Sequence, residues 1–481
     1  MDQPQSFHIL TVGNFPVLVR NLWDRVAAKG GYRMSHIAHP TYDKRSWPKD
    51  LRSNEVHFFR DDIRSQLAMP APEPAFLASL EKGRVPTIHN MIMSDRLISK
   101  LPYAEALAYA TFLAKRFAAL YESTAPSVVI GSFDSLHNSL GFAVANHMGI
   151  PWFTPLFSPL PGDEAAFCSD LSPASRVNFE EHRADGLRTK ADELVADFEC
   201  RKLAAGAYIP PELFSAAFIF GQIPAQLGAI IRVLRSRRLR SFLKFTDYPK
   251  SYSIRGMVGE AFRLRKNLWL LHRRKLLDKP VREPFVFFGL HMQPESSIDV
   301  FAHFFSNQER VIELIARSIP PTHSLLVKLH KSDTLNYSTQ LLARYARFPG
   351  VRLVSPYADT FEFITKADLI FAIQGTIGLE GALLGKPVIM FGDSPAKVFP
   401  SVSTIGKTID LPALVRRKFA EAPPSRAAVV AAFAAYLAPY YPAAQNDWSI
   451  TPTDAQIGDF AGLIELLREH VGATNVKALA E

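Results

Sequence analysis

Short apolar runs alternate with amphipathic stretches along the first 175 residues. Apolar runs of about four to eight residues that end at glycine or polar residues are typical of buried strands, and apolar positions repeating every three to four residues or so indicate helices. By these criteria strands are expected at 7–12, 32–37, 127–130 and 151–153, and helices at 17–29, 103–122 and 136–148. The succession of strand, helix, glycine and strand predicts a βαβ unit, and therefore a parallel sheet with helices on both faces.

The same alternation resumes at residue 284, after a mostly helical stretch, and ends near residue 391. Here strands are expected at 284–290, 324–330, 351–354, 367–373 and 387–391, and helices at 309–318, 339–347, 360–365 and 377–384. The residues from about 416 onward are rich in Ala and Pro and favour helix and loop.

These patterns predict an α/β protein made of two doubly wound, Rossmann-like domains that face each other across a cleft. The expected segments are an N-terminal domain at 1–175, a helical basic insertion at 176–282, a second domain at 283–415 and a helical tail at 416–481. Ligands of such sheets bind beyond the carboxyl ends of the parallel strands. Residues that directly follow the strands are therefore the first candidates for a site.

The composition fits a folded protein of two or three domains. The chain has 481 residues, of which 48% are hydrophobic and 21% charged. Its two cysteines, Cys168 and Cys200, are too few for a disulfide framework and lack the paired neighbours of a zinc site. The N-terminal residues do not resemble a signal peptide, and polar residues interrupt the longest apolar stretch, 216–234. We therefore expect a cytoplasmic protein without a bound metal.

Basic residues are concentrated in one segment. Residues 232–282 contain 16 Lys and Arg but only 3 Asp and Glu, whereas the whole chain has a net charge of +9. Many of these basic residues are interleaved with leucine and aromatic residues, a composition that favours the surface of an anionic membrane. A solvated helical face and a nucleic-acid site are the alternatives. Because no RNA- or DNA-binding motif is present, no nucleic-acid partner is expected.

The strand expected at 367–373 leads into a glycine, a threonine and a new helix. Gly375 and Thr376 stand where that helix begins, and the free N–H groups and the dipole of a helix start suit a phosphate group. Glu380 lies four residues further on, so it projects from the same face as Thr376. There it can accept hydrogen bonds from two ribose hydroxyls. The alternative is a glycine turn followed by a surface glutamate.

Glu380 and the downstream Gly385-Lys386-Pro387-Val388-Ile389 together resemble the nucleotide-binding half of GT-B glycosyltransferases. More narrowly, residues 285–392 are similar to the capsule polysaccharide biosynthesis family, which includes the Kdo transferases. The matching motifs are, in order, Gln293-Pro294, His330 at a strand end, and Gly375-Thr376 with Glu380.

Polar residues after two of the strands carry further candidate chemistry. Gln293, Glu295 and His330 are the candidate catalytic residues here, and Lys328 and Lys331 join the glycine turn as candidate donor-binding residues. An amide can hold sugar hydroxyls by donating and accepting at once, and His and Lys bring donors toward an anionic substrate. Lys331 stands where the family usually has proline, so this loop can take another path. The alternative for His330 is a structural histidine.

Asp134 is the catalytic candidate of the N-terminal domain, because it follows the strand at 127–130. Its carboxylate can act as a base toward an acceptor hydroxyl, as a nucleophile on the sugar, or as a cap of the next helix. Asp95, His89 and His137 are weaker candidates.

The resemblance implies a glycosyltransferase that moves a sugar to a lipid-linked or growing surface polysaccharide. The donor would be CMP-Kdo or a UDP-sugar, held by the second domain, and the acceptor would bind the first. No cofactor or metal is expected to be required. With the basic segment, these expectations describe an enzyme peripheral to the inner face of the cell membrane. A sugar-nucleotide epimerase of similar fold and a non-catalytic adaptor that binds glycan or membrane are the alternatives.

Overall fold

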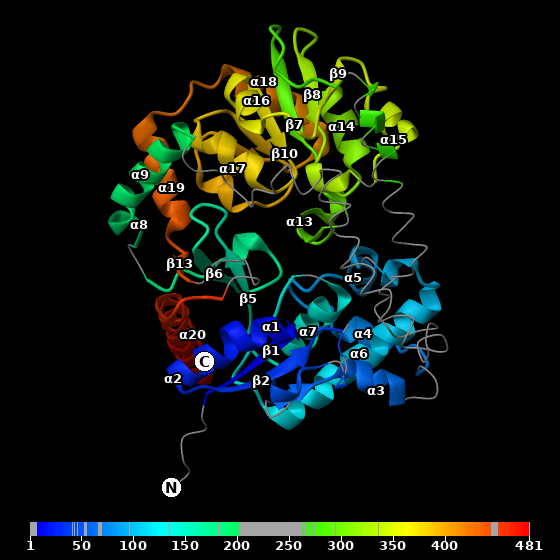
Figure 1. Ribbon diagram of the computed structural model, residues 1–481, viewed down its shortest axis with the longest axis vertical. Helices are drawn as coiled ribbons and strands as arrows, with labels where there is room; N and C mark the ends of the chain where they lie inside the picture. The colour runs from blue at the N-terminus through cyan, green and yellow to red at the C-terminus, as the bar shows by residue number, and fades with distance from the viewer. Residues whose placement is uncertain are drawn as a thin grey trace. The chain divides into compact units, whose positions relative to one another are not determined.

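The computed structural model forms two compact units (Figure 1). The residues that it describes are 7–40, 42, 44–45, 47–51, 55–65, 70–95, 97–133, 135–180, 183–201, 263, 266–267, 269–271, 273–274, 276–293, 295–334, 336–443 and 451–480. Among these, the residues up to Arg183 and from Ala438 onward form the first unit, and Ala184 to Leu437 form the second.

The first unit is built on a seven-stranded sheet. Its strands are β1 (His8–Asn14), β2 (Arg33–Ala38), β3 (Glu55–His57), β4 (Val128–Ile130), β5 (Trp152–Phe157), β6 (Glu164–Cys168) and β13 (Tyr441–Pro442). The strand order is β13-β6-β5-β4-β1-β2-β3. The strands from β5 to β3 pair in parallel, and β6 and β13 extend the sheet in antiparallel pairing.

Helices pack on this sheet. They are α1 (Pro16–Leu18), a π-helical turn (Val19–Trp23), α2 (Asp24–Gly30), α3 (Phe59–Ser65), α4 (Pro74–Ser79), α5 (Ile88–Ser94), α6 (Tyr103–Thr124), α7 (Ser135–His147) and α20 (Asp454–Ala480). The C-terminal helix α20 returns to the start of the chain and packs on α2. There Phe460 meets Trp23 edge to face, with ring centroids 5.7 Å apart, and the Tyr32 hydroxyl donates to Glu465 over 2.7 Å.

The second unit is built on a six-stranded sheet in which every pair is parallel. Its strands are β7 (Phe285–Gly289), β8 (Ser324–Lys328), β9 (Val351–Val354), β10 (Leu369–Ala372), β11 (Val388–Met390) and β12 (Val402–Thr404), in the order β12-β11-β10-β7-β8-β9. Its helices are α8 (Arg183–Gly186), α9 (Arg188–Glu199), α13 (Ser296–Asp299), α14 (Gln308–Ala316), α15 (Thr339–Tyr345), α16 (Thr360–Lys366), α17 (Thr376–Leu383), α18 (Leu411–Ala420) and α19 (Arg426–Leu437).

The central strands of the second sheet are buried along their whole length, which explains their continuous apolar sequences. Every residue of β7 and of β10 is buried. Such strands have helices on both faces, so no position faces water. On one face α14 contributes Val311, Ile312 and Ile315 to the core, and on the other Phe363 of α16 stacks on Phe287 with centroids 5.6 Å apart.

The predicted α/β class with two doubly wound, Rossmann-like sheets is confirmed. Every strand and helix expected from the sequence is present, and the expected βαβ unit is β4-α7-β5. The sequence pattern did not predict β3, β6, β12 or β13. The expected tail, 416–481, contributes α18 and α19 to the second unit and α20 to the first. The facing of the domains across a cleft stays a prediction.

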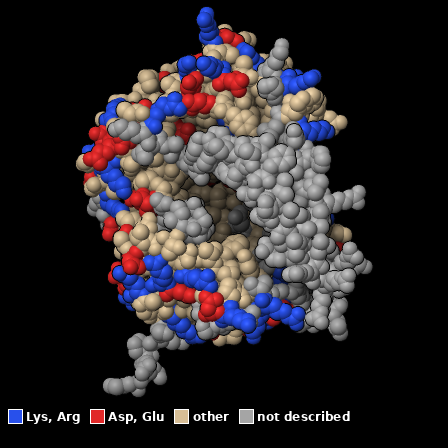
Figure 2. All heavy atoms as spheres, in the orientation of Figure 1, with Lys and Arg blue, Asp and Glu red and all other residues tan. Residues whose placement is uncertain are grey.

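The expected basic insertion, 176–282, is helical at α8 and α9, and residues 202–262 lie outside the described residues. Elsewhere, on the face drawn in Figure 2, basic and acidic side chains of the described residues are intermingled. No helix among the described residues is both long enough and apolar enough to cross a membrane.

Candidate functional site

The carboxyl ends of three neighbouring strands form the candidate site in the second unit. Strands β10, β7 and β8 lie side by side at the centre of the sheet and run in parallel, so their carboxyl ends share one edge. The loop after β7 carries His291, the end of β8 carries Lys328 and His330, and β10 leads into Gly375 and α17. The polar residues predicted after these strands therefore lie at the same edge of the sheet.

The turn from β10 into α17 requires glycine. Gly375 has a φ of 95°, and a Cβ atom at this residue would lie 2.9 Å from His291 Cε1. A side chain is therefore excluded both by backbone conformation and by contact. The N–H of Gln374 donates to His291 Nε2 over 3.3 Å, which joins the turn to the end of β7.

The first turn of α17 has the features of an anion site. Gly375 is its N-cap residue and is exposed, and no side chain caps the helix. The N–H groups at the start of a helix have no partner within the helix, and they lie at the positive end of its dipole. The predicted phosphate-binding role of Gly375 and Thr376 is consistent with this geometry.

Glu380 projects toward the same end of α17, as the sequence predicts. Its carboxylate is half-buried, and the hydroxyl of Thr376 donates to it. Burial raises the pKa of Glu380 to about 7, opposed by the hydrogen bond from Thr376 and by the charge of Lys328. Glu380 is therefore a carboxylate that changes charge near neutral pH.

Lys328 is the last residue of β8, and its ammonium group donates to the carbonyl oxygen of Pro356 over 3.0 Å. Burial lowers the pKa of Lys328 to about 8, and the charge of Lys331 adds to this effect. Glu380 and Asp359 act in the opposite direction. Lys328 thus lies within electrostatic reach of both Lys331 and Glu380.

His330 lies where the sequence places it, and its ring has a structural contact. Nδ1 accepts from the N–H of Ser332 over 3.3 Å, as the cap of the short 3-10 helix Lys331–Asp333. Burial, followed by the charge of Lys328, lowers the pKa of His330 to about 4. A neutral ring that accepts at Nδ1 carries its proton on Nε2. His330 therefore has a structural role through Nδ1, and its Nε2–H remains a hydrogen-bond donor.

Gln293 has a structural role. Its amide nitrogen donates to Asp299 Oδ1 over 2.9 Å and to the carbonyl oxygen of Ser306 over 3.0 Å. Both donors of the amide are thus engaged within the loop. The backbone N–H of Glu295 donates to Asp299 Oδ2 over 2.9 Å, and Glu295 is the N-cap residue of α13. The predicted catalytic roles of Gln293 and Glu295 stay predictions.

The sequence analysis also selected four residues of the first unit, Asp134, Asp95, His89 and His137. Asp134 lies outside the described residues. Asp95 is buried and accepts from the backbone N–H groups of Leu97, Ile98 and Leu136, so it is a structural cap.

Two histidines of the first unit also have surroundings of their own. His89 stacks on Tyr103 and its Nε2 lies 2.6 Å from the tyrosine hydroxyl. His137 is buried among aromatic rings, and its nitrogens have no hydrogen-bond partner among the described residues.

His291 is a site residue that the sequence analysis did not select. It lies between the glycine turn and the end of β8, and burial, followed by His330, lowers its pKa to about 4. Its position directly after the apolar strand, two residues before Gln293, is a signal that the sequence already carries. The contact with Gly375, however, depends on the pairing of β7 with β10.

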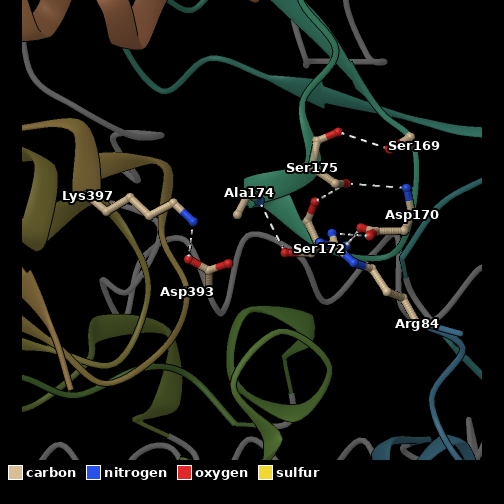
Figure 3. A network of polar contacts seen from close by, with 8 residues as sticks. All are labelled: Arg84, Ser169, Asp170, Ser172, Ala174, Ser175, Asp393 and Lys397. Carbon is tan, nitrogen blue, oxygen red and sulfur yellow. Dashed lines mark hydrogen bonds and ion pairs between the residues drawn. The ribbon is translucent and has the colours of Figure 1, made fainter. Parts of the chain in front are cut away.

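Polar side-chain contacts also stabilise the loops after two other strands (Figure 3). In the first unit, after β6, Asp170 accepts from the N–H of Ser172 over 2.7 Å and pairs with Arg84 over 3.3 Å. In the second unit, after β11, Lys397 pairs with Asp393 over 2.7 Å. The Asp393 carbonyl also accepts from the Gln374 side chain over 2.6 Å, so this loop supports the glycine turn.

Within the described part of the chain, no group of three or more His, Cys, Asp or Glu side chains is arranged to hold a metal ion. The polar groups of the site are instead suited to an anionic organic ligand: the start of α17, two lysines, a histidine donor and a carboxylate for hydroxyl groups.

No protein-family model matches the chain, and no curated protein matches it. Solved structures with some likeness include the β-Kdo 2,4 transferase KpsC of Thermosulfurimonas dismutans, with 14% identity, a TM-score of 0.30, and coverage of 64% of this chain and 79% of that one. The glycotransferase of kitacinnamycin has 12% identity, a TM-score of 0.26, and coverage of 90% and 95%.

A UDP-GlcNAc 2-epimerase of Methanocaldococcus jannaschii, in complex with UDP-GlcNAc and UDP, has 11% identity, a TM-score of 0.28, and coverage of 88% and 97%.

Proposed function

We propose that this protein is a glycosyltransferase that uses a nucleotide sugar held by its second unit. The observation that carries this proposal is the convergence of Lys328, His330 and Glu380 beside the uncapped start of α17. The helix start and the lysines suit the phosphates of a donor, and the Glu380 carboxylate suits the two hydroxyls of a ribose.

In this proposal the protein supplies the positive charge that the leaving nucleotide needs. Departure of the nucleotide places negative charge on a phosphate oxygen, and preorganised donors stabilise such charge. The N–H groups of the first turn of α17 and the ammonium groups of Lys328 and Lys331 are the donors of the described residues that would act there. His330 would donate from Nε2 to the donor substrate.

The finer identity of the reaction rests on the family resemblance. It indicates a donor of CMP-Kdo or UDP-sugar type and a lipid-linked or growing surface polysaccharide as acceptor. Asp134 of the first unit would take the proton from the acceptor hydroxyl or act as the nucleophile.

Attachment to an anionic membrane surface is the second part of the proposal. The basic segment 232–282 supports it, and so do its described residues. Trp269 is 57% exposed, and the Arg273 guanidinium lies 4.7 Å from the centre of its ring, whereas Leu271 is buried in the core of the second unit. An exposed tryptophan beside arginine suits the interface of a bilayer, where the ring is partly apolar and partly wet.

Incubation with CMP-, UDP- and GDP-sugars, with and without a glycan acceptor, tests the proposed reaction. We expect sugar to appear on the acceptor. Conversion of the free donor into another sugar nucleotide would identify an epimerase instead. No reaction of any donor, with the fold intact, would favour the non-catalytic adaptor.

A further inference from the structure

We infer that a second layer of side chains fixes the backbone of the strand-end residues, and that Gln308 and Tyr337 are its principal positioning residues. This inference rests on the proposed function, because it concerns the same site. Three residues of the site, His291, Gln293 and His330, each have both their N–H and their C=O groups bound by side chains from neighbouring segments.

Gln308 holds the backbone of His291. The N–H of His291 donates to Gln308 Oε1 over 2.8 Å, and Gln308 Nε2 donates to the His291 carbonyl oxygen over 3.1 Å. Gln308 is the first residue of α14 and is only 4% exposed, so the helix fixes the position of its amide. The amide side chain pairs here with a peptide group in the way that the backbone of a neighbouring strand would.

Tyr337 holds the backbone of His330 with a single atom. Its hydroxyl accepts from the N–H of His330 over 2.6 Å and donates to the carbonyl oxygen of the same residue over 3.0 Å. Tyr337 is 2% exposed and belongs to the core of the second unit. A hydroxyl group can donate and accept at once, so phenylalanine would keep the packing but lose both bonds.

Asp333 and Asn336 hold the backbone of Gln293 in the same way. The N–H of Gln293 donates to the Asp333 carboxylate, and Asn336 Nδ2 donates to the Gln293 carbonyl oxygen over 3.2 Å. Asn336 Nδ2 also donates to Asp333 Oδ1 over 2.5 Å. These hydrogen bonds join the loop after β7, which carries His291, to the loop after β8, which carries His330.

The fixed backbones place each histidine ring in one tautomer. His330 accepts at Nδ1 from Ser332, and His291 accepts at Nε2 from Gln374. The neutral rings therefore carry their protons on opposite nitrogens, Nε2 in His330 and Nδ1 in His291. A ring that turned or changed tautomer would present an acceptor instead of a donor, so the second layer determines which atom the ligand meets.

The Tyr337→Phe variant tests this inference, with Tyr345→Phe as the matched control. Tyr345 is another buried tyrosine of the same unit, with 8% exposure. Among the described residues, it makes no hydrogen bond to His330. The first measurement is a nitrogen NMR spectrum of histidine-labelled protein, which distinguishes the two tautomers and needs no substrate. The second is the kinetics of donor consumption.

In Tyr337→Phe, with the fold intact, we expect the single Nε2–H signal of His330 to be replaced by an average of tautomers. We expect kcat to fall by about tenfold or more with a smaller change in the KM of the donor, because misplacement of a positioned group by about 1 Å is costly. Tyr345→Phe should resemble the wild type in both measurements. If Tyr337→Phe leaves the His330 signal unchanged, or if Tyr345→Phe changes it equally, the positioning role is wrong.

Gln308→Glu provides a second variant if Tyr337→Phe does not fold. It keeps an oxygen for the N–H of His291 but loses the donor to the His291 carbonyl, so the signal of His291 should change and that of His330 should not. Failure of the proposed function is distinguishable: a wild-type protein that binds no nucleotide would refute the function, while the tautomer spectra would still confirm or refute the positioning layer.

Discussion

The pKa values of Glu380 and Lys328 both lie close to neutral pH, because burial removes part of the water around each charged group. Burial raises the pKa of the glutamate to about 7 and lowers that of the lysine to about 8. A ligand that supplies phosphate to the lysine and hydroxyl groups to the glutamate would favour the charged form of each. Binding and protonation at this site are therefore linked.

Nucleotide-sugar affinity should be highest between the pKa values of Glu380 and Lys328 and should fall as the pH is lowered below about 7, because the Glu380 carboxylate takes up a proton in the free protein near its raised pKa. Below that pKa the loss should approach tenfold per pH unit or so. Calorimetry with a donor whose phosphates do not titrate in this range measures the slope. Glu380→Gln should remove most of it, and an unchanged slope in this variant would assign the pH dependence to another group.

At the scale of elements, the turn between β10 and α17 is the least replaceable part of the site. Gly375→Ala would force a side chain into a left-handed backbone and against the His291 ring, at a cost of about 1–3 kcal/mol for the conformation alone. We expect a lower melting temperature of the second unit and weaker nucleotide binding. Gly406→Ala is the control, since a Cβ there meets nothing within 4 Å. Equal melting temperatures for both variants would contradict the proposed constraint.

His137, on helix α7, should make the first unit less stable at acidic pH. Burial lowers the pKa of His137 from its ordinary value of 6.5 to about 3, so the unfolded chain takes up a proton first. The contribution of His137 to stability is present above pH 6.5 and is lost as the pH falls below it, by about 2 kcal/mol at pH 5. Urea unfolding of wild type and His137→Leu at pH 7 and at pH 5 measures the difference. A similar acid loss in both proteins would exclude His137 as its cause.

The elements that the sequence predicted are those that depend on local pattern. Apolar runs ending in glycine or polar residues identified β7, β8 and β10, and parallel pairing then required their ends to meet. The partners of the side chains were not predictable, because they depend on the paths of loops. The sequence indicated Gln293 as an amide that could hold sugar hydroxyls, whereas the loop after β7 engages both of its donors. Nothing local to His330 indicated that Tyr337 would hold its backbone.

At the scale of the whole molecule, the described part of the chain leaves the first unit after Arg183 and returns to it at Ala438. The short strand β13 then joins the sheet beside β6, and α20 covers α2. This return was not predicted, because a strand of two residues has no periodicity to detect. The basic segment lies within the part of the chain between these two positions.

Binding to anionic vesicles should depend on that segment. Each basic residue near such a surface contributes about 1 kcal/mol, within a Debye length of the membrane. Flotation with anionic liposomes should therefore be strong at low salt and fade as salt rises, and neutral liposomes should bind poorly. The variant with Arg235, Arg237, Arg238 and Arg240 changed to Ser should be released. A control with the same loss of charge changes Lys82, Lys100, Lys407 and Arg416, which are exposed, to Ser.

Retention of the first variant, or equal release of the control, would assign any binding to net charge alone. Flotation that is equal with neutral and anionic lipid, or absent with both, would leave the segment as a solvated basic face.

Nucleotide binding by the wild type and by Glu380→Ala tests the central claim most directly. In a panel of CMP, UDP, GDP and their sugars, at least one ligand should raise the melting temperature of the wild type, since binding to the folded state stabilises it. Glu380→Ala should fold normally and bind that ligand about tenfold more weakly or worse, which corresponds to the loss of a charge-assisted hydrogen bond. Glu362→Ala, on α16, should bind like the wild type. Equal affinity of a folded Glu380→Ala protein, or no binding of any nucleotide by the wild type, would contradict the donor site proposed here.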